Sequence, residues 1–448
     1  MLPVKYKFAL HAPLARRKGD KAIRTSLALP TDSHGSSRAL DYHEQKRRAS
    51  GPILDDTLHD KLDITCVKLN DPERYIRTYK RARADMGKAA GTDRVRGDDY
   101  SDSEIAQALR RISKSISKGT FVANEHREVH IPKPDGKFRT LSIPILAERV
   151  IAKSLNNALL DVLDSQMPDA FHGYRRNRGI LTLLATIAAS DRTGKDLFIA
   201  TADIQDAFPT TSKASVAAAL QEFVPDEALR DLLLRLSFPG TSEKGLPQGL
   251  ATSTTLFILT LSHRLTWGPS GPADDTLIRL AYSDNLVYVS STAEAIRTAN
   301  LKHQDELSDI GMNLKAPDSL NPILVSSEAS IDILGTTLNR RNGALAYRPM
   351  VGGWQKLERD IRNTYCLADP ITGAANMLFG WIERNRHIVA SFGVTSITSR
   401  LVQLCTTAGI EGVSQDSVEN AAVRAEREWK LLVAGRNIPL PPEPTTDW

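Results

Sequence analysis

Residues 198–208 read FIATADIQDAF, and residues 280–289 read LAYSDNLVYV. Each stretch is an apolar run of strand-forming residues interrupted by an acidic side chain, Asp203 in the first and Asp284 in the second. A buried, unpaired carboxylate is costly, so acids that emerge from two apolar strands are expected to share a divalent cation. A turn or a helix cap explains one such acid well, but it explains two less well.

The sequence around these stretches alternates between helical and strand patterns. Apolar spacing and a Ser101–Glu104 capping box predict a helix over 101–119, and alternation around a Pro-Asp-Gly turn predicts a hairpin over 128–144. Further patterns predict helices over 145–165, 213–223, 227–237, 252–266, 292–310 and beyond 353, and strands over 197–203, 277–290 with an internal turn, 331–338 and 344–348. We therefore expect an α+β fold.

The composition bounds the protein class. The chain has 448 residues, 41% hydrophobic and 25% charged, which is typical of a globular protein with about three domains at roughly 150 residues each. Its three cysteines show no metal-ligand spacing, and no apolar run approaches the roughly 20 residues of a membrane span. We expect a reducing, cytoplasmic setting without a disulfide framework or a membrane anchor.

Positive charge is concentrated near the N-terminus. Residues 1–50 hold eleven Lys and Arg against four acids, whereas the whole chain has a net charge of only +5. This segment is interpreted as a basic arm, with a solvated tail as the alternative and a weaker likeness to an organelle transit peptide. Residues 71–88 predict a helix with a basic face suited to phosphates, although an ordinary exposed helix fits nearly as well.

Several further motifs share the order found in one enzyme family. They are GTD at 91–93, VHIPKPDGKFRTLSIP at 129–144 with ERV at 148–150, FHGYRRNR at 171–178, DIQDAF at 203–208, GLPQG at 245–249, YSDN at 282–285 and ILG at 333–335. In this order they resemble reverse transcriptases of the bacterial group II intron-like branch, over about residues 91–386. Each motif alone is weak evidence, and the ordered set is strong.

The resemblance implies a right-hand polymerase with fingers, a palm of antiparallel sheet plus helices, and a helical thumb. The implied divisions are a basic extension at 1–70, fingers with the start of the palm at 71–202, a palm at 203–338 and a thumb with a tail at 339–448. The implied activity is RNA-directed DNA synthesis. No nuclease or RNase H-like residue set follows, so we expect a polymerase without such modules.

The resemblance also implies roles for individual residues. Two Mg²⁺ ions, or Mn²⁺, would be held by Asp203, Asp284 and the Ile204 carbonyl, with Asn285 as a further catalytic position. The residues implied to bind the dNTP substrate are Lys133, Lys137, Arg139, Phe208, Gln248 and Tyr282. The residues implied to bind nucleic acid are Arg175, Arg178 and Gly335. A solvated hairpin tip, a Pro-Gly turn and a core aromatic are the structural alternatives for the basic residues, Gln248 and Phe208.

Two positions depart from the family pattern. Asn285 stands where the second of two consecutive aspartates is usual, which removes one negative charge from the metal site. A natural variant that still polymerises, an engineered substitution and a fold retained only for binding remain open explanations. Asp318 stands where a lysine often protonates pyrophosphate, and Lys315, three residues earlier, is the substitute in reach.

The implied partners are an RNA template, a DNA primer and dNTPs, with a dedicated noncoding RNA as a further candidate. An aromatic ring at Phe208 occupies the volume of a ribose 2′-hydroxyl, so dNTPs are favoured over rNTPs and an RNA-dependent RNA polymerase is disfavoured. Family analogy alone connects such proteins to defence against phage. The second hypothesis is an RNA-binding protein with a polymerase fold that is inactive because of Asn285.

Overall fold

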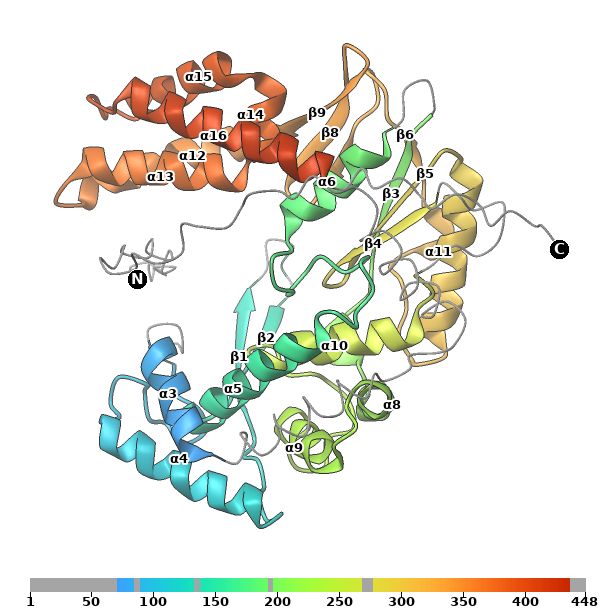
Figure 1. Ribbon diagram of the computed structural model, residues 1–448, viewed down its shortest axis with the longest axis vertical. Coiled ribbons are helices and arrows are strands. Elements are labelled where there is room, and N and C mark those ends of the chain that lie inside the picture. The colour runs from blue at the N-terminus through green and yellow to red at the C-terminus, as the bar shows by residue number, and fades with distance from the viewer. Residues whose placement is uncertain are drawn as a thin grey trace, which may run out of the picture. The chain divides into compact units, whose positions relative to one another are not determined.

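The computed structural model describes residues 71–83, 89–132, 136, 138–191, 196–267 and 277–435, all within one compact unit of the chain. Figure 1 shows their arrangement. The expected basic arm at 1–50, Lys133 and Lys137 lie outside the described residues, and so does the side chain of Asp318.

A four-stranded antiparallel sheet carries both acidic strand ends. Its strands are β3 (Phe198–Asp203), β4 (Ile278–Tyr282), β5 (Asn285–Ser290) and β6 (Ile323–Leu324), in the order β4-β5-β3-β6. The predicted strand with an internal turn over 277–290 is therefore confirmed as the β4–β5 hairpin. β3 lies at the centre of the sheet, which brings Asp203 next to the hairpin turn.

Both faces of this sheet are covered, because alternate side chains enter two different hydrophobic clusters. Helix α11 (Ala293–Ser308) packs on one face and helix α6 (Ile180–Ser190) lies on the other (Figure 1). The α11 side buries Ala200, Ala202, Leu286 and Tyr288, and the α6 side buries Ile199, Val287 and Val289. Because both faces of the sheet are buried, the sequences of the strands are near-continuous apolar runs.

The N-terminal part of the described chain is helical and follows the sequence patterns closely. It contains α3 (Pro72–Ala82), α4 (Asp102–Ser117) and α5 (Leu146–Leu163), which pack on one another. The capping box is confirmed, because the Ser101 side chain accepts from the Glu104 N–H and the Glu104 carboxylate accepts from the Ser101 N–H.

The predicted hairpin and the following helices are also confirmed. Strands β1 (Arg127–Pro132) and β2 (Phe138–Ile143) pair antiparallel. The next helices are α7 (Ala207–Thr210), α8 (Lys213–Phe223), α9 (Glu227–Ser237) and α10 (Ala251–Arg264). Helix α10 contacts both α5 and α8, so it joins the N-terminal helices to the region that follows β3.

The C-terminal part combines a small sheet with a helical bundle. Strands β7 (Ile331–Ile333), β8 (Thr336–Arg341) and β9 (Ala344–Pro349) form an antiparallel sheet. The single strand expected near 331–338 is in fact two strands, because Leu334 and Gly335 both take positive φ and form a turn. The helices that follow are α12 (Gly353–Arg362), α13 (Pro370–Arg384), α14 (Arg386–Phe392), α15 (Val394–Thr407) and α16 (Gln415–Ala434).

Among the described helices, none alone has the length and apolar composition of a membrane span, although α14 and α15, bent by 111° at their junction, meet that criterion as a pair.

Candidate active site at the strand ends

The two acidic strand ends meet as neighbours in the sheet. Asp203, the last residue of β3, is the register partner of Asn285, the first residue of β5. The Ile204 N–H donates to the Asp284 carbonyl at 2.9 Å, which makes Asp203 and Asn285 a pair without mutual backbone hydrogen bonds. In such pairs the side chains approach most closely, so the carboxylate and the amide share one face of the sheet.

That face is the one that α6 covers farther along the strands. Asp203 lies on the same face of β3 as Ile199, and Asn285 lies on the same face of β5 as Val287. Ile199 and Val287 are both buried in the α6-side cluster. Thr201 lies between Ile199 and Asp203 on β3 and is exposed. The apolar cover therefore stops short of the strand ends and leaves the carboxylates half exposed.

The turn between β4 and β5 is strained at a residue that is not glycine. Ser283 has φ of 59° and its side chain is buried, whereas Asp284 and Asn285 beside it are half-buried. Serine rarely adopts this conformation, and strained backbone of this kind is concentrated at functional sites. The strain fixes the direction in which the Asp284 side chain leaves the turn.

A neighbouring segment, residues 170–173, supports this turn through close backbone packing. The His172 N–H donates to the Ala281 carbonyl, and the Ala281 N–H donates to the Ala170 carbonyl, both at 2.8 Å. A Cβ at Gly173 would lie 2.7 Å from the Ser283 nitrogen, so only glycine fits at this position. The sequence motif included Gly173, but nothing in it predicted this parallel pairing with β4.

Two tyrosines stand beside the turn. The rings of Tyr174 and Tyr282 lie 6.4 Å apart between centroids, and half of Tyr174 is exposed. Burial raises the pKa of Tyr282 above its ordinary value, and the nearby Tyr174 adds to this increase. The Tyr282 hydroxyl therefore stays protonated at physiological pH.

Lys315 lies on the other side of β3. Its N–H donates to the Asp203 carbonyl at 2.8 Å, and its Nζ lies 3.1 Å from Asp203 Oδ2. The Asp203 carboxylate is 43% exposed and the Lys315 side chain 57%, so this ion pair is solvated and weak. The structure brings Lys315, the substitute expected from the sequence, directly to the Asp203 carboxylate.

The donor set at this site fits a hard divalent cation. The residues implied to hold it offer the Asp203 and Asp284 carboxylates and the Ile204 carbonyl, all oxygen ligands of the kind Mg²⁺ and Mn²⁺ prefer. Within the described ranges, no group of three or more His, Cys, Asp or Glu side chains has metal-binding geometry. The site therefore depends on two carboxylates and on neutral oxygens.

Phe208 and Gln248 connect this site to the surrounding loops. The Phe208 ring stacks on Phe257 with 5.0 Å between centroids, and its carbonyl accepts from the Leu246 N–H. Farther along the same loop, the Gln248 carbonyl accepts from the Ser142 N–H of β2 at 2.8 Å. The 245–249 loop thus joins the end of β3 to the β1–β2 hairpin.

Gly249 permits the second of these contacts. It has φ of 129°, and a Cβ there would lie 2.7 Å from the Ser142 carbonyl oxygen. Arg139, another predicted substrate residue, is exposed on β2 opposite Ile131. The structure thus places Gln248 next to the hairpin that carries Arg139, while their contacts with a substrate remain predictions.

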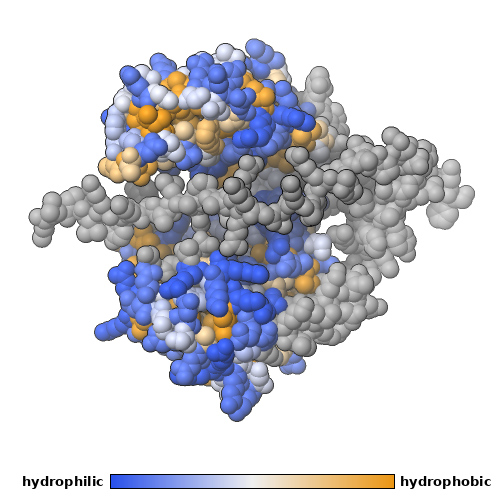
Figure 2. All heavy atoms as spheres, turned by 60° about the vertical axis from the view of Figure 1, so that its left-hand side comes forward, coloured by the Kyte–Doolittle hydropathy of each residue, from blue (hydrophilic) through white to orange (hydrophobic). Residues whose placement is uncertain are grey.

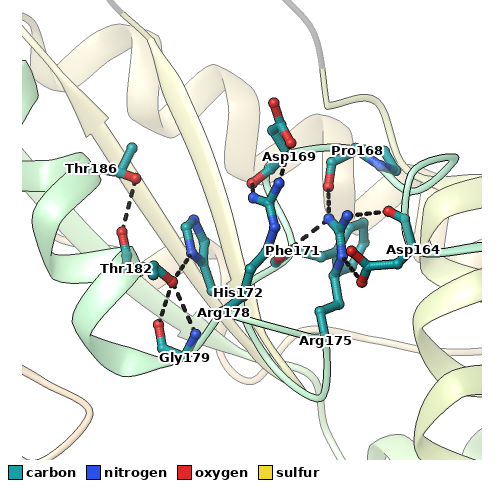
Figure 3. A network of polar contacts seen from close by, with 10 residues as sticks. All are labelled: Asp164, Pro168, Asp169, Phe171, His172, Arg175, Arg178, Gly179, Thr182 and Thr186. Atoms are coloured by element: carbon teal, nitrogen blue, oxygen red, sulfur yellow. Dashed lines mark hydrogen bonds and ion pairs between the residues drawn. The ribbon is translucent and has the colours of Figure 1, made fainter. Parts of the chain in front are cut away.

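Arg175, which the resemblance implies binds nucleic acid, is buried in the described structure, and that role stays a prediction. Its side chain is only 2% exposed, and its Nε donates to the Asp164 carboxylate at 3.0 Å. The same guanidinium donates to the carbonyls of Asp164, Pro168 and Phe171 (Figure 3). Burial lowers the pKa of Arg175, and the hydrogen bond with Asp164 opposes this decrease. Arg175 therefore holds the loop after α5 in place, and its guanidinium is hardly accessible to a phosphate.

Arg178 and Gly335 remain predictions. Arg178 pairs with the Asp169 carboxylate and donates to the Asp169 carbonyl at 3.0 Å, and 17% of its side chain is exposed (Figure 3). Gly335 has φ of 88° in the β7–β8 turn, and a Cβ there would meet nothing within 4 Å. Both positions are accessible from outside, unlike Arg175.

Part of the chain is similar to a known protein family. Residues 131–318 match the family described as reverse transcriptase (RNA-dependent DNA polymerase). The COX1/OXI3 intron 1 protein of Saccharomyces cerevisiae is 28% identical over 168 residues, which are 36% of this chain and 20% of that protein. The group II intron-encoded protein LtrA of Lactococcus lactis is 24% identical over 187 residues, or 40% of this chain and 30% of that protein.

The chain thus spans less than a third of either curated relative. Among solved structures, a Candida tropicalis telomerase in complex with a fragment of telomeric RNA is similar with a TM-score of 0.41 and 10% identity, over 78% of this chain and 68% of that one. A score this low supports no inference. Residues 131–318 are thus similar to the reverse transcriptase family, and the α+β architecture predicted from the sequence is confirmed.

Proposed function

We propose that this chain is an RNA-directed DNA polymerase that adds dNTPs to a DNA primer on an RNA template. The observation that carries the proposal is the pairing of Asp203 with Asn285, which places the Asp284 turn against the end of β3. Carboxylates on two rigid strand ends, half exposed to solvent, are the arrangement that nucleotidyl transfer requires.

Asp203 and Asp284, with the Ile204 carbonyl, would hold two divalent ions, which when bound supply Lewis-acid activation of the primer hydroxyl and charge neutralisation at pyrophosphate. The chain's own residues do the positioning. The strained Ser283 turn orients Asp284, and Gly173 allows the supporting backbone to reach it. Lys315, whose Nζ lies 3.1 Å from Asp203 Oδ2, would donate a proton to the leaving group.

Phe208 supports the choice of dNTPs. Its ring is held by stacking on Phe257, and its carbonyl is fixed by the Leu246 N–H. A ring in a fixed position offers no acceptor to a ribose 2′-hydroxyl and excludes its volume.

Asn285 favours a second candidate function, that of an RNA-binding protein with an impaired catalytic site. Its Nδ2 lies 3.4 Å from Asp284 Oδ1, so the amide directs a donor toward a carboxylate that a metal needs. Two carboxylates bind Mg²⁺ less tightly than three.

Primer extension separates these two functions. Oligo-dT on poly-rA is incubated with dTTP and Mg²⁺ or Mn²⁺, using the chain, Asp203→Ala and Asn285→Asp. Activity of the unchanged chain that is absent from Asp203→Ala supports the polymerase. Activity of Asn285→Asp alone supports the binding protein.

The biological setting is also a proposal. We propose that the chain works in a bacterial cytoplasm on RNA, including a dedicated noncoding RNA, in defence against phage; family analogy is the support. Sequencing of the RNA and DNA recovered with the chain from a native host, together with phage plating on cells that carry Asp203→Ala, tests both parts.

A further inference from the structure

An open cavity of about 340 Å³ lies outside the strand-end site, between α3 and α5. Its lining is entirely polar: Arg74, Arg77, Thr78, Arg81, Ser154, Asn157, Asp161 and Arg176. Four arginines thus face one aspartate, and no aromatic or aliphatic side chain takes part. We call it the arginine pocket.

The helical repeat explains why α3 supplies three of these arginines. Arg74, Arg77 and Arg81 are spaced three and four residues apart, so they form one stripe along the helix. Tyr75 and Tyr79 on another face are buried, which fixes the helix with its arginines toward the pocket. The basic helix expected from the sequence over 71–88 is therefore a directed surface and not merely a solvated one.

Helix α5 presents the opposite wall by the same spacing. Ser154, Asn157 and Asp161 lie three and four residues apart. The Ser154 side chain is buried, and its hydroxyl accepts from Arg74 Nε at 3.3 Å. This contact holds the Arg74 guanidinium at the pocket while leaving its positive charge uncompensated.

The charge of the pocket exceeds what its neighbours neutralise. Asp161 pairs with Arg176, and Asp71, outside the pocket, pairs with Arg77 at 3.4 Å. Both of those ion pairs are more than 40% exposed on each side and are easily exchanged for another anion. Among the described contacts, no acidic side chain pairs with Arg74 or Arg81.

The pocket is also close to the proposed active site along the chain. Arg176 follows Tyr174 by two residues, so their Cα atoms are at most about 7 Å apart. Tyr174 stands beside Tyr282 of the catalytic turn. Arg176, one of the residues that line the arginine pocket, is therefore close to the β4–β5 turn.

From these observations we infer that the arginine pocket binds the phosphodiester backbone of a nucleic-acid strand, beyond the catalytic site and without reading its sequence. The inference rests on the proposed function for the identity of the strand. Guanidinium groups recognise phosphate oxygens in pairs, and the lack of an aromatic wall leaves no place for a base. A free nucleotide would lack the base contacts that small-molecule sites normally provide.

Equilibrium binding tests this inference without any catalytic step. Fluorescently labelled single-stranded RNA and DNA are titrated in EDTA with the chain and with the triple variant Arg74→Gln, Arg77→Gln, Arg81→Gln, at several salt concentrations. Loss of three phosphate contacts should flatten the slope of log K against log salt by about 2, and weaken binding about a hundredfold in 0.1 M salt. Circular dichroism and thermal unfolding confirm that the variant is folded.

The matched control removes three charges from the adjacent helix. Arg111, Lys114 and Lys118 are exposed residues on or just after α4 that do not line the pocket, and their triple change to Gln should weaken binding less than about threefold. Weaker binding of either RNA or DNA by the pocket variant supports the inference. The nucleic acid that shows the stronger loss of binding identifies the strand.

Three results would overturn the inference. The first is unchanged binding of RNA and DNA by the pocket variant. The second is an equal loss of binding in the α4 control. The third is a loss of binding that is seen only with ATP, used as a probe for free phosphate groups. Asp203→Ala should bind RNA as the unchanged chain does, because it leaves the pocket intact. Failure of the proposed polymerase function would therefore be detected by primer extension. Failure of the inference about the arginine pocket would be detected by the binding measurement.

Discussion

Arg175 and Arg176 are neighbours in the chain, yet they lie in opposite environments. Arg175 is buried and its guanidinium is satisfied by the Asp164 carboxylate and by main-chain carbonyls (Figure 3). Arg176 is 52% exposed, pairs with the half-exposed Asp161, and lines the arginine pocket. The comparison teaches that burial and compensation, and not residue type, decide whether an arginine stabilises the fold or binds a ligand.

The same contrast extends to larger regions. The side of the molecule that carries α3 and α4 is brought forward in Figure 2, where its surface is largely hydrophilic. The strand-end site likewise keeps its carboxylates half exposed, whereas residues 171–173 of the segment that supports it are buried. Changes to buried groups should therefore act first on folding, and changes to exposed groups first on activity.

The largest expected effect is on stability. Arg175→Ala should lower the free energy of unfolding by about 3–5 kcal/mol, because it leaves Asp164 and three carbonyl contacts without their partner. Arg176→Ala should lower it by less than about 1 kcal/mol, because its ion pair is exposed. Denaturant unfolding of both variants measures the difference, and equal values would break the comparison.

Gly173 sharpens the comparison, since it is buried but acts on the exposed site. Gly173→Ala should reduce dTMP incorporation about a hundredfold, because its Cβ displaces the Ser283 turn and so misplaces Asp284. Gly179→Ala in the same loop is the control, because φ there is extended and a Cβ meets nothing within 4 Å. Equal activity of the two variants would show that the close packing at Gly173 is unimportant.

Phe208 is intermediate between the buried and the exposed groups, because its ring is half-buried against Phe257. Phe208→Val should reduce the preference for dTTP over UTP by roughly 10- to 100-fold, because it opens the volume that the 2′-hydroxyl needs. The ratio of incorporation rates on one template measures this preference within a single preparation. If the unchanged chain incorporates UTP as readily as dTTP, the ring is a core aromatic and not a selectivity residue.

Asn285 belongs to the exposed group of residues, and its substitution should have the smallest effect on activity. Asn285→Asp should lower the Mg²⁺ concentration for half-maximal incorporation about tenfold, or about 1.4 kcal/mol, because it restores a negative charge beside Asp284. Mn²⁺ binding followed by electron paramagnetic resonance gives the same comparison without catalysis. Weaker divalent binding by the variant would remove Asn285 from the metal site.

Local patterns predicted most of the fold. The capping box at Ser101 and the hairpin around the Pro-Asp-Gly turn were correct because both are determined by residues close in sequence. Helix α6 (180–190) was missing from the predictions, since it is apolar on nearly all sides and has no clear period. The β7–β8 turn was missed because Leu334, which is not glycine, takes positive φ beside Gly335.

The sequence predicted that Asp203 and Asp284 lie close together, but it did not predict the segment that supports the turn between β4 and β5. Asp203 and Asp284 were identified because acids at the ends of apolar strands are unusual. The pairing of residues 170–173 with β4 joins segments about a hundred residues apart, and no local signal records it. The burial of Arg175 has the same cause, because its partner Asp164 is reached only when the loop closes back on α5.

The most direct test of the proposed polymerase activity is a change of charge at Asp203 without a change of shape. Extension of oligo-dT on poly-rA is compared between the chain and Asp203→Asn, in the same divalent ion and with folding verified for both. We predict that the chain extends the primer and that Asp203→Asn is slower by at least about a hundredfold, since several kcal/mol of charge stabilisation is lost. Equal extension by the two proteins would contradict the assignment of Asp203 to the catalytic site.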